Sequence, residues 1–338
     1  MGWIKTCVEN YLITRSRCLT KPYDAVVNVL AAFMGGFYLY TSGTGIITIE
    51  SHLGVFFGIT LALIFLCYPG RVKAPMDRFT FWDSLFALLG LGVGFYFVYS
   101  YPGFVQRVGE YTKLDVTVGM LAIILCIEAA RRSVGVMLPV VSILALLYAY
   151  KGISQTLPSL IAHRGFDFIR ISTFMYTSLD GLFGVVTYTL ATYVIPFALF
   201  GAFLQRSGVG KFFINLPYAL FGTTSSGTAQ VAVIGSALLG TVSGSPVANV
   251  VTTGTFTLPL MKKSGYKPEV AGAIESASSS GSMFTPPVMG SAAFFMVEFT
   301  GIPYIEIVKI AFIPAILYYV GVSAMVHIHA AKHGLKGL

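Results

Sequence analysis

Residues 229–260 read AQVAVIGSALLGTVSGSPVANVVTTGTFTLPL, and almost every one of them is small or apolar. As one straight helix this stretch would be roughly 48 Å long at 1.5 Å per residue, whereas the hydrocarbon core of a bilayer is about 30 Å thick. The sequence Ser243-Gly244-Ser245-Pro246 interrupts it with a flexible glycine and a helix-breaking proline. Each arm, 229–242 and 247–260, is then about 21 Å long. The pattern predicts a re-entrant helical hairpin whose tip lies near the bilayer midplane.

A second interruption follows within residues 269–300. An arm at 269–279 meets Ser280-Gly281-Ser282 and then Thr285-Pro286-Pro287, before a second arm at 288–299. Two consecutive prolines remove two backbone donors, and the residue before a proline is displaced from the helical conformation. This pattern predicts a discontinuous helix.

The composition places the chain in a membrane. Of its 338 residues, 55% are hydrophobic and only 11% are charged, against about 25% charged in soluble domains. We therefore expect an all-α integral membrane protein, a multi-span helical bundle, and this excludes a soluble Rossmann or barrel oxidoreductase. The net charge is +8, but the basic residues lie between the apolar runs and form no continuous patch. We therefore expect the lipid bilayer as a partner and no nucleic acid.

Four apolar runs precede a shift toward Gly, Ser, Thr and Pro, and we place a domain boundary at that shift. Residues 1–22 are predicted to be a cytoplasmic or interfacial lead-in, residues 23–134 a four-span region, and residues 135–338 a second region. Lysine and arginine after the second and fourth spans indicate the cytoplasmic side, which places the N-terminus in the cytoplasm. The four spans are predicted at 25–40, 53–68, 85–99 and 116–130.

The second region is expected to alternate spans with interfacial helices. Charged residues within 155–178 favour an amphipathic helix at the membrane interface over a span. Beside the two interrupted segments, spans are predicted at 137–150, 182–204 and 311–326, and shorter interfacial or linking helices at 211–221 and 304–309.

The two interruptions gather neutral oxygen atoms. In hydrocarbon, unpaired backbone groups are costly, so a broken helix persists only where protein, water or a ligand satisfies them. Hydroxyl, amide and carbonyl oxygens suit a small hard cation such as Na⁺ better than a transition metal. Helix packing is the alternative use of such small residues, and it explains Asn249 least well. The side chains concerned are Ser243, Ser245, Asn249, Thr252 and Thr253, followed by Ser278, Ser279, Ser280, Ser282 and Thr285.

Charged residues inside the apolar runs carry further information. Glu275 lies in an otherwise small and apolar arm, where a proton relay or cation contact and a pore-lining or partner-bonded structural carboxylate remain equally open. Glu128 precedes Arg131 and Arg132 by three and four residues, which predicts ion pairs at a helix end. The chain contains no GxxxxGK[ST] and no GxSxG sequence, and no GxGxxG follows a strand. We therefore expect neither an enzyme nor an ATP-driven pump.

Three segments together resemble a known family: residues 243–254 (SGSPVANVVTTG), 259–266 (PLMKKSGY) and 286–290 (PPVMG). They look like the large, DctM-like membrane subunit of tripartite ATP-independent periplasmic (TRAP) transporters. The four preceding spans resemble the small membrane subunit of the same transporters, as it occurs in fused permeases.

The resemblance implies a sodium-coupled, elevator-type importer in the bacterial inner membrane. A separate extracytoplasmic solute-binding protein would deliver its small organic acid, a carboxylate-type solute. Residues 23–134 would form a fixed scaffold, and residues 135–338 the transport region. Na⁺ would be the coupling ion, with no other cofactor. By similarity the sodium ion would be held by Ser243, Ser245, Asn249, Ser278, Ser279 and Gly281, and the substrate path shaped by Thr252, Thr253, Thr285, Pro286 and Pro287.

The large subunit of that family has two inverted repeats, each with a hairpin and a broken helix, whereas this sequence contains one such pair. It would therefore form one half of an inverted-repeat transporter. Three explanations remain open: a fragment of a longer chain, a split gene whose second polypeptide supplies the other repeat, or a truncated permease that is inactive alone. A noncatalytic membrane scaffold or receptor subunit is the alternative of a different class, and it needs no broken helices.

Overall fold

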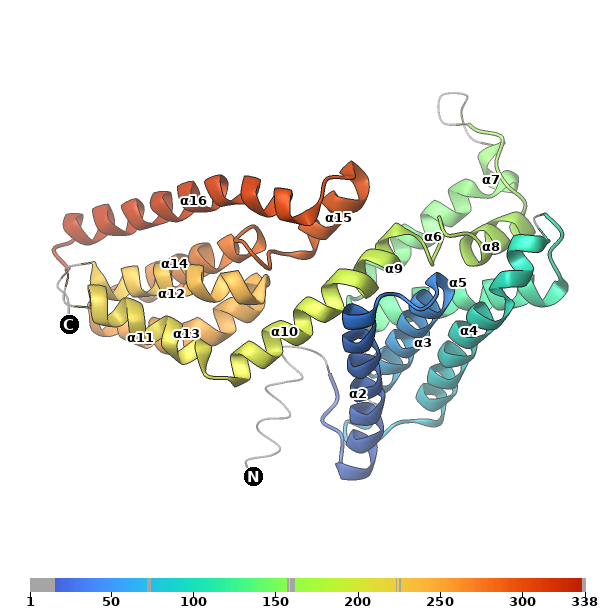
Figure 1. Ribbon diagram of the computed structural model, residues 1–338, viewed down its shortest axis with the longest axis horizontal. Helices are drawn as coiled ribbons and strands as arrows, with labels where there is room; N and C mark the ends of the chain where they lie inside the picture. The colour runs from blue at the N-terminus through green and yellow to red at the C-terminus, as the bar shows by residue number, and fades with distance from the viewer. Residues whose placement is uncertain are drawn as a thin grey trace. The chain divides into compact units, whose positions relative to one another are not determined.

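The computed structural model describes residues 16–71, 74–107, 109–156, 158, 162–222, 224 and 226–335. They form two compact units, which divide between Thr192 and Tyr193. Both units are built of helices (Figure 1). Within the described ranges there is no strand, only an isolated bridge between Tyr150 and Phe166. The predicted all-α fold class is confirmed, whereas most of the predicted lead-in, 1–22, lies outside the described residues.

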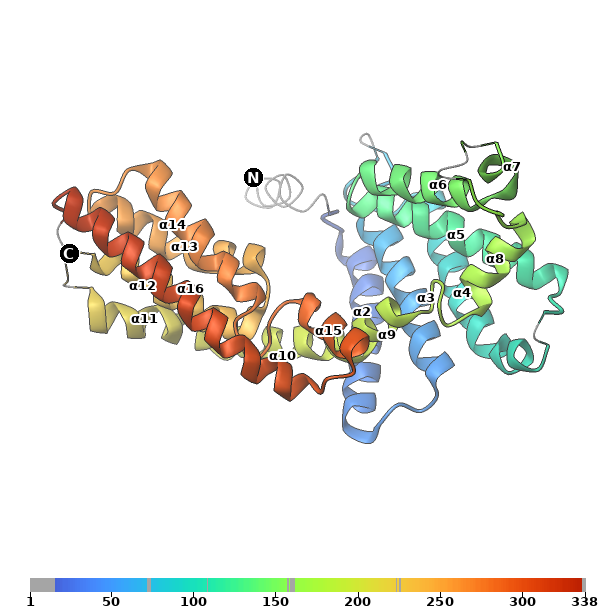
Figure 2. The same cartoon turned by 90° about the horizontal axis from the view of Figure 1, so that it is seen from above.

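The core of the first unit lies among α3, α4, α5 and α8, which run close together in the view of Figure 2. Helices α3 and α4 approach closely because glycines line their contact: a Cβ on Gly94 would lie 2.5 Å from the carbonyl oxygen of Gly54. The helices of this unit are α2 (Lys21–Thr44), α3 (Ile49–Cys67), α4 (Phe81–Gln106), α5 (Lys113–Ser133), α6 (Met137–Ala149), α7 (Lys151–Ser154), α8 (Phe168–Thr177) and α9 (Val185–Thr189).

A buried ionic cluster joins four segments of the first unit. Asp83 caps the start of α4, where its carboxylate accepts a hydrogen bond from the backbone N–H of Thr80 at 3.0 Å. The two carboxylate oxygens also accept from Arg17 and from Arg132, each at 2.6 Å. Arg132 in turn contacts Glu128 at 2.8 Å, as the sequence predicted. Arg17 and Arg132 also donate to the carbonyls of Leu66 and Tyr68 at the end of α3. Because buried charges are stable only when paired, this cluster ties the ends of α3, α4 and α5 together.

The second unit contains the two predicted interruptions. Helices α12 and α13 are the arms of the hairpin, and α14 and α15 flank the second break. Helix α16 lies along α12 and α14 (Figures 1 and 2). After the π-helical turn η1 (Leu190–Val194), the elements are α10 (Ile195–Arg206), α11 (Val209–Phe221), α12 (Gly227–Ser243), α13 (Pro246–Lys263), α14 (Pro268–Ser280), the 3₁₀ turn η2 (Gly281–Met283), α15 (Ser291–Thr300) and α16 (Tyr304–Lys332).

Five predicted elements differ from the structure in extent. The predicted surface helix at 304–309 and span at 311–326 are one continuous helix, α16, because the charged residues of its first turns need not end it. The amphipathic helix predicted over 155–178 is confined to α8 among the described residues. The arms α12 and α13 have 17 and 18 residues, or roughly 25 and 27 Å. They are longer than predicted, and the depth of the hairpin tip in the bilayer stays a prediction.

Five helical segments of the described chain are long and apolar enough to cross a membrane. The predicted spans at 116–130 and 137–150 form α5 and α6 but are not among the five, because α5 carries charges at both ends and α6 has 13 residues. The five segments are Lys21–Thr44, Ile49–Cys67, Phe81–Gln106, Val185–Leu204 and Tyr304–Lys332.

The predicted region boundary at residue 134 does not coincide with the division between compact units. Helices α6 and α8, which follow this boundary, pack against α5 within the first unit. The predicted boundary separates a scaffold region from a transport region, which the packing of helices does not test, so it stays a prediction.

Candidate ion and substrate site

The tip of the hairpin consists of two residues between α12 and α13. Gly244 ends α12 in the left-handed conformation, with φ 57°, which glycine adopts without strain. Ser245 begins α13, where its hydroxyl accepts a hydrogen bond from the backbone N–H of Ala248 at 3.4 Å, and Pro246 occupies the first helical position. Serine as N-cap and proline after it form a typical helix start. The local sequence therefore explains why the chain stops and restarts here.

The second interruption comprises η2 and residues 284–290. The backbone N–H of Gly290 donates to the carbonyl of Met283 at 2.7 Å, which closes this loop. Tyr304, at the start of α16, holds the loop from outside: its hydroxyl lies 2.7 Å from the carbonyl oxygen of Pro287 and 2.8 Å from that of Val288. The freed carbonyl groups of the broken helix are thus partly satisfied by a neighbouring helix, as lipid surroundings require.

The two interruptions lie against each other. The backbone N–H of Val288 donates to the carbonyl of Thr241 at 3.3 Å, and a Cβ on Gly244 would lie 1.9 Å from the carbonyl oxygen of Met289. Beside this contact is a cavity of about 530 Å³. It is lined by residues 242–246 and Ala248 of the hairpin, Met283 and residues 288–291 of the second interruption, and Phe294, together with Val194, Phe197, Ala198, Gly201 and Ala202.

Two of the predicted sodium ligands, Ser243 and Ser245, line this cavity, and a third, Asn249, is fully buried on α13. The amide Nδ2 of Asn249 donates to the carbonyl of Ser236 at 2.8 Å. Its Oδ1 is buried without a hydrogen-bond partner among the described residues, and the same is true of Ser243 Oγ. Buried polar atoms are nearly always paired, so these two unpaired oxygens are exceptions within the second unit.

The other three predicted ligands, on α14 and η2, are not part of the cavity wall. Ser278 is buried on α14, and its hydroxyl donates to the carbonyl of Ile274 at 2.7 Å. Ser279 donates to Glu275 at 3.4 Å. Gly281 packs against Tyr319, whose hydroxyl oxygen would lie 2.5 Å from an added Cβ. Helix α14 and η2 pack against both arms of the hairpin, so all six residues belong to one helix cluster, although the cavity wall includes two of them.

The predicted substrate-path residues flank the cavity without lining it. Thr252 donates to the carbonyl of Ala248 at 2.8 Å, as a hydroxyl on a helix commonly does. Thr285 donates to the carbonyl of Gly281 at 2.6 Å. Thr253 is fully buried, and of the two prolines Pro286 is buried and Pro287 exposed. In this part of the chain, the cavity wall is formed by residues 288–291, which directly follow the two prolines.

Glu275 is hydrogen-bonded on all sides. Its side chain accepts from Thr253 at Oε1, from Thr257 at 2.5 Å and from Ser279 at 3.4 Å. The Thr253 hydroxyl also lies 2.9 Å from the carbonyl oxygen of Asn249. Glu275 thus joins α13 to α14, one hydrogen-bonded residue away from Asn249. This favours the partner-bonded carboxylate of the two possibilities left open above. Thr257 is the contributor that sequence reasoning missed, and its spacing of four residues from Thr253 was the signal.

Comparison with known proteins gives a consistent set of relatives. Residues 121–338 match the family described as Tripartite ATP-independent periplasmic transporter, DctM component. The protein YgiK of Salmonella typhimurium is 28% identical over 164 residues, which are 48% of this chain and 36% of that protein. The C4-dicarboxylate TRAP transporter large permease protein DctM of Rhodobacter capsulatus is 32% identical over 130 residues, 36% of this chain and 30% of that protein.

A third relative, the ectoine/5-hydroxyectoine TRAP transporter large permease protein UehC of Ruegeria pomeroyi, is 30% identical over 141 residues, 41% of this chain and 32% of that protein. The chain spans about a third of the length of the curated relatives it matches.

Proposed function

Because this chain belongs to the DctM component family of TRAP transporters, we propose that it is a permease component of a sodium-coupled, binding-protein-dependent secondary transporter for carboxylate-type solutes. It resides in the bacterial inner membrane with its N-terminus in the cytoplasm. An extracytoplasmic solute-binding protein delivers the small organic acid. The chain matches about a third of the length of its curated relatives, and a fragment, a split gene and a truncated permease that is inactive alone are the three explanations of this difference.

The observation that carries this proposal is the contact between the two interruptions beside the 530 Å³ cavity. The N-terminal ends of α13 and α15 both reach the cavity wall, through Ser245–Pro246 and Gly290–Ser291. The N-terminus of a helix carries partial positive charge and favours an anionic group. The C-terminal end of α12, at residues 242–244, presents carbonyl groups that favour a cation. The cavity therefore has positively polarised helix N-termini for a carboxylate and a negatively polarised helix C-terminus for the accompanying Na⁺.

The unpaired oxygens support the sodium part of the proposal. Asn249 Oδ1 and Ser243 Oγ are both neutral, hard and buried, which is the character that a small alkali or alkaline-earth cation accepts. Glu275, one hydrogen-bonded residue away, adds a carboxyl group to the same helix cluster.

Reconstitution tests the proposal. The chain, completed with the rest of a family permease, is placed in liposomes, and uptake of radiolabelled succinate is measured with its binding protein under an inward Na⁺ or K⁺ gradient. We expect uptake only with Na⁺ and only with the binding protein. Equal uptake in Na⁺ and K⁺ would refute sodium coupling, and uptake without the binding protein would refute the tripartite assignment. A well-folded complex that transports no carboxylate with any binding protein would favour the scaffold or receptor alternative.

A further inference from the structure

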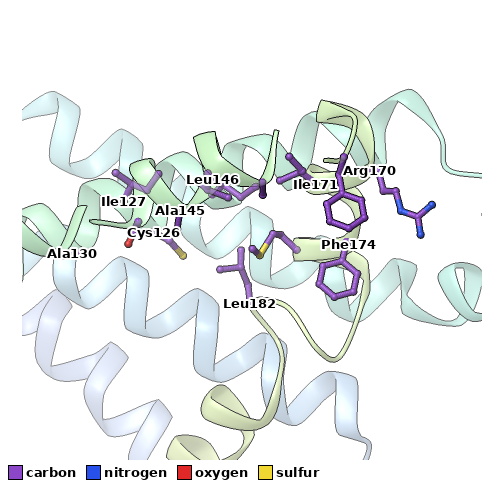
Figure 3. A pocket seen from close by; sticks show the side chains of 14 residues that line it. Cys126, Ile127, Ala130, Ala145, Leu146, Arg170, Ile171, Phe174 and Leu182 are labelled. Carbon is purple, nitrogen blue, oxygen red and sulfur yellow. The ribbon is translucent and has the colours of Figure 1, made fainter. Parts of the chain in front are cut away.

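A second cavity, in the first unit, has walls unlike those of the site above. It measures about 780 Å³ and lies among α5, α6 and α8 (Figure 3). Thirteen of the 14 side chains that line it are uncharged, and most are aliphatic or aromatic. Ser142 adds no free polar group, because its hydroxyl donates to the carbonyl of Leu138 at 3.0 Å within α6. A carboxylate solute would find almost no hydrogen-bonding partner here, so the cavity is suited to a hydrocarbon chain.

The surroundings of this cavity are apolar as well. Helix α6, which forms one wall, buries only Pro139 of its 13 residues, and it exposes large apolar side chains such as Met137 and Leu144. In a chain that spans a membrane, such a helix faces lipid or another apolar helix. Acyl chains are therefore the hydrocarbon that is available at the cavity mouth.

The single charged residue on the wall is Arg170 of α8. Figure 3 shows its side chain at one end of the cavity, directed away from the apolar residues Cys126 and Ala130 at the other end. The guanidinium lies over the ring of Phe166, 5.7 Å from the ring centroid. No carboxylate among the described residues lies within ion-pair distance of it. The neighbouring Asp167 pairs with Lys151 instead, and this contact raises the pKa of the Lys151 ammonium.

We propose that this cavity binds an anionic phospholipid, with one acyl chain between α5, α6 and α8 and the phosphate on Arg170. A guanidinium binds phosphate oxygens through two parallel hydrogen bonds, and that of Arg170 has no carboxylate partner among the residues that the structure describes. A zwitterionic lipid carries its own ammonium group, which competes with Arg170 for the phosphate. The headgroup contact thus selects anionic lipid, while the apolar walls accept any acyl chain.

Lipid retention tests this site without reference to transport. The purified full chain in detergent is titrated with dioleoylphosphatidylglycerol or dioleoylphosphatidylcholine, and bound lipid is counted by native mass spectrometry. We expect one tightly retained phosphatidylglycerol and weaker retention of phosphatidylcholine. Arg170→Ala should weaken phosphatidylglycerol binding about tenfold or more and remove the preference, while Arg170→Lys should retain part of it. Arg206→Ala, at an exposed arginine of the second unit, is the matched control and should change nothing.

A variant of the cavity wall separates the acyl-chain contact from the headgroup contact. Ala145→Phe places a ring in the cavity without touching Arg170, and should abolish retention of both lipids. Equal retention of the two lipids by the parent chain, or unchanged phosphatidylglycerol binding by Arg170→Ala, overturns the headgroup assignment. Unchanged retention by Ala145→Phe overturns the acyl-chain assignment.

Discussion

The carbonyl oxygen of Met289 occupies the space that a Cβ on Gly244 would need, since the two positions would be 1.9 Å apart. The hairpin tip and the second interruption therefore touch through main-chain atoms, and a side chain at position 244 would separate them. Two features require glycine at position 244: this close approach, and the positive φ of 57°.

Gly244→Ala should open the contact between the interruptions. The left-handed conformation alone disfavours alanine by about 1–2 kcal/mol, and the clash with Met289 adds to this. Gly301→Ala is the control, because Gly301 has φ 68° with no atom near its missing Cβ. We expect thermal unfolding in detergent at a clearly lower temperature for the variant at 244 than for the control. Equal melting temperatures would show that the contact is unimportant.

Asn249→Ala should weaken sodium dependence while leaving membrane insertion intact. Removing the unpaired Oδ1 takes away one oxygen ligand, and a tenfold higher Na⁺ concentration for half-maximal uptake corresponds to about 1.4 kcal/mol. Thr255→Ala, at an exposed hydroxyl on the same helix, should leave the sodium response unchanged. The measurement is uptake by the completed permease over a series of Na⁺ concentrations, and an unaltered sodium curve for Asn249→Ala contradicts the assignment.

Glu275→Ala should destabilise the second unit, because it removes the buried carboxyl group that Thr253 and Thr257 contact from α13 and leaves these hydroxyls only the carbonyls of their own helix as acceptors. The expected loss is about 1–3 kcal/mol in the free energy of unfolding. Glu275→Gln keeps one acceptor oxygen and should lose less. Glu269→Ala, at an exposed carboxylate of the same helix, serves for comparison in an SDS titration. If all three variants unfold alike, the carboxylate does not hold α13 to α14.

Asp83→Asn should be among the most damaging substitutions in the first unit. It leaves the buried Arg17 without a counter-charge and Arg132 with Glu128 alone, and breaking a buried pair in this way typically costs about 3–5 kcal/mol. Asp77→Asn, at an exposed position before α4, should change stability by less than about 0.5 kcal/mol. Loss of helical circular dichroism on heating measures both, and similar curves would rule out a supporting role for the cluster.

The interrupted helices could be predicted because their causes are local. Glycine, proline and a capping serine act on their own backbone, so residues 243–246 alone indicate where α12 stops and α13 starts. The ion pair between Glu128 and Arg132 was predictable for the same reason, since both residues lie on one helix. The composition was sufficient for the membrane class.

Contacts between distant segments could not be predicted in this way. Asp83 meets Arg17 and Arg132 across 66 and 49 residues of sequence, and nothing in its local sequence indicates these partners. The predicted site residues illustrate the same limit: hydroxyl-rich sequence indicated which segments matter, but packing decided that Ser243 and Ser245 reach the cavity wall while Ser278 and Ser279 turn to their own helix.

The hydrogen bond from the Val288 amide to the Thr241 carbonyl has a mechanical consequence. If the hairpin or the loop at 284–290 moved without the other, this hydrogen bond would break and leave an N–H and a carbonyl group unpaired in the membrane interior, which is costly. Displacements of this part of the protein should therefore carry both bends as a single block, so that whatever is held between them is moved without being released on the way.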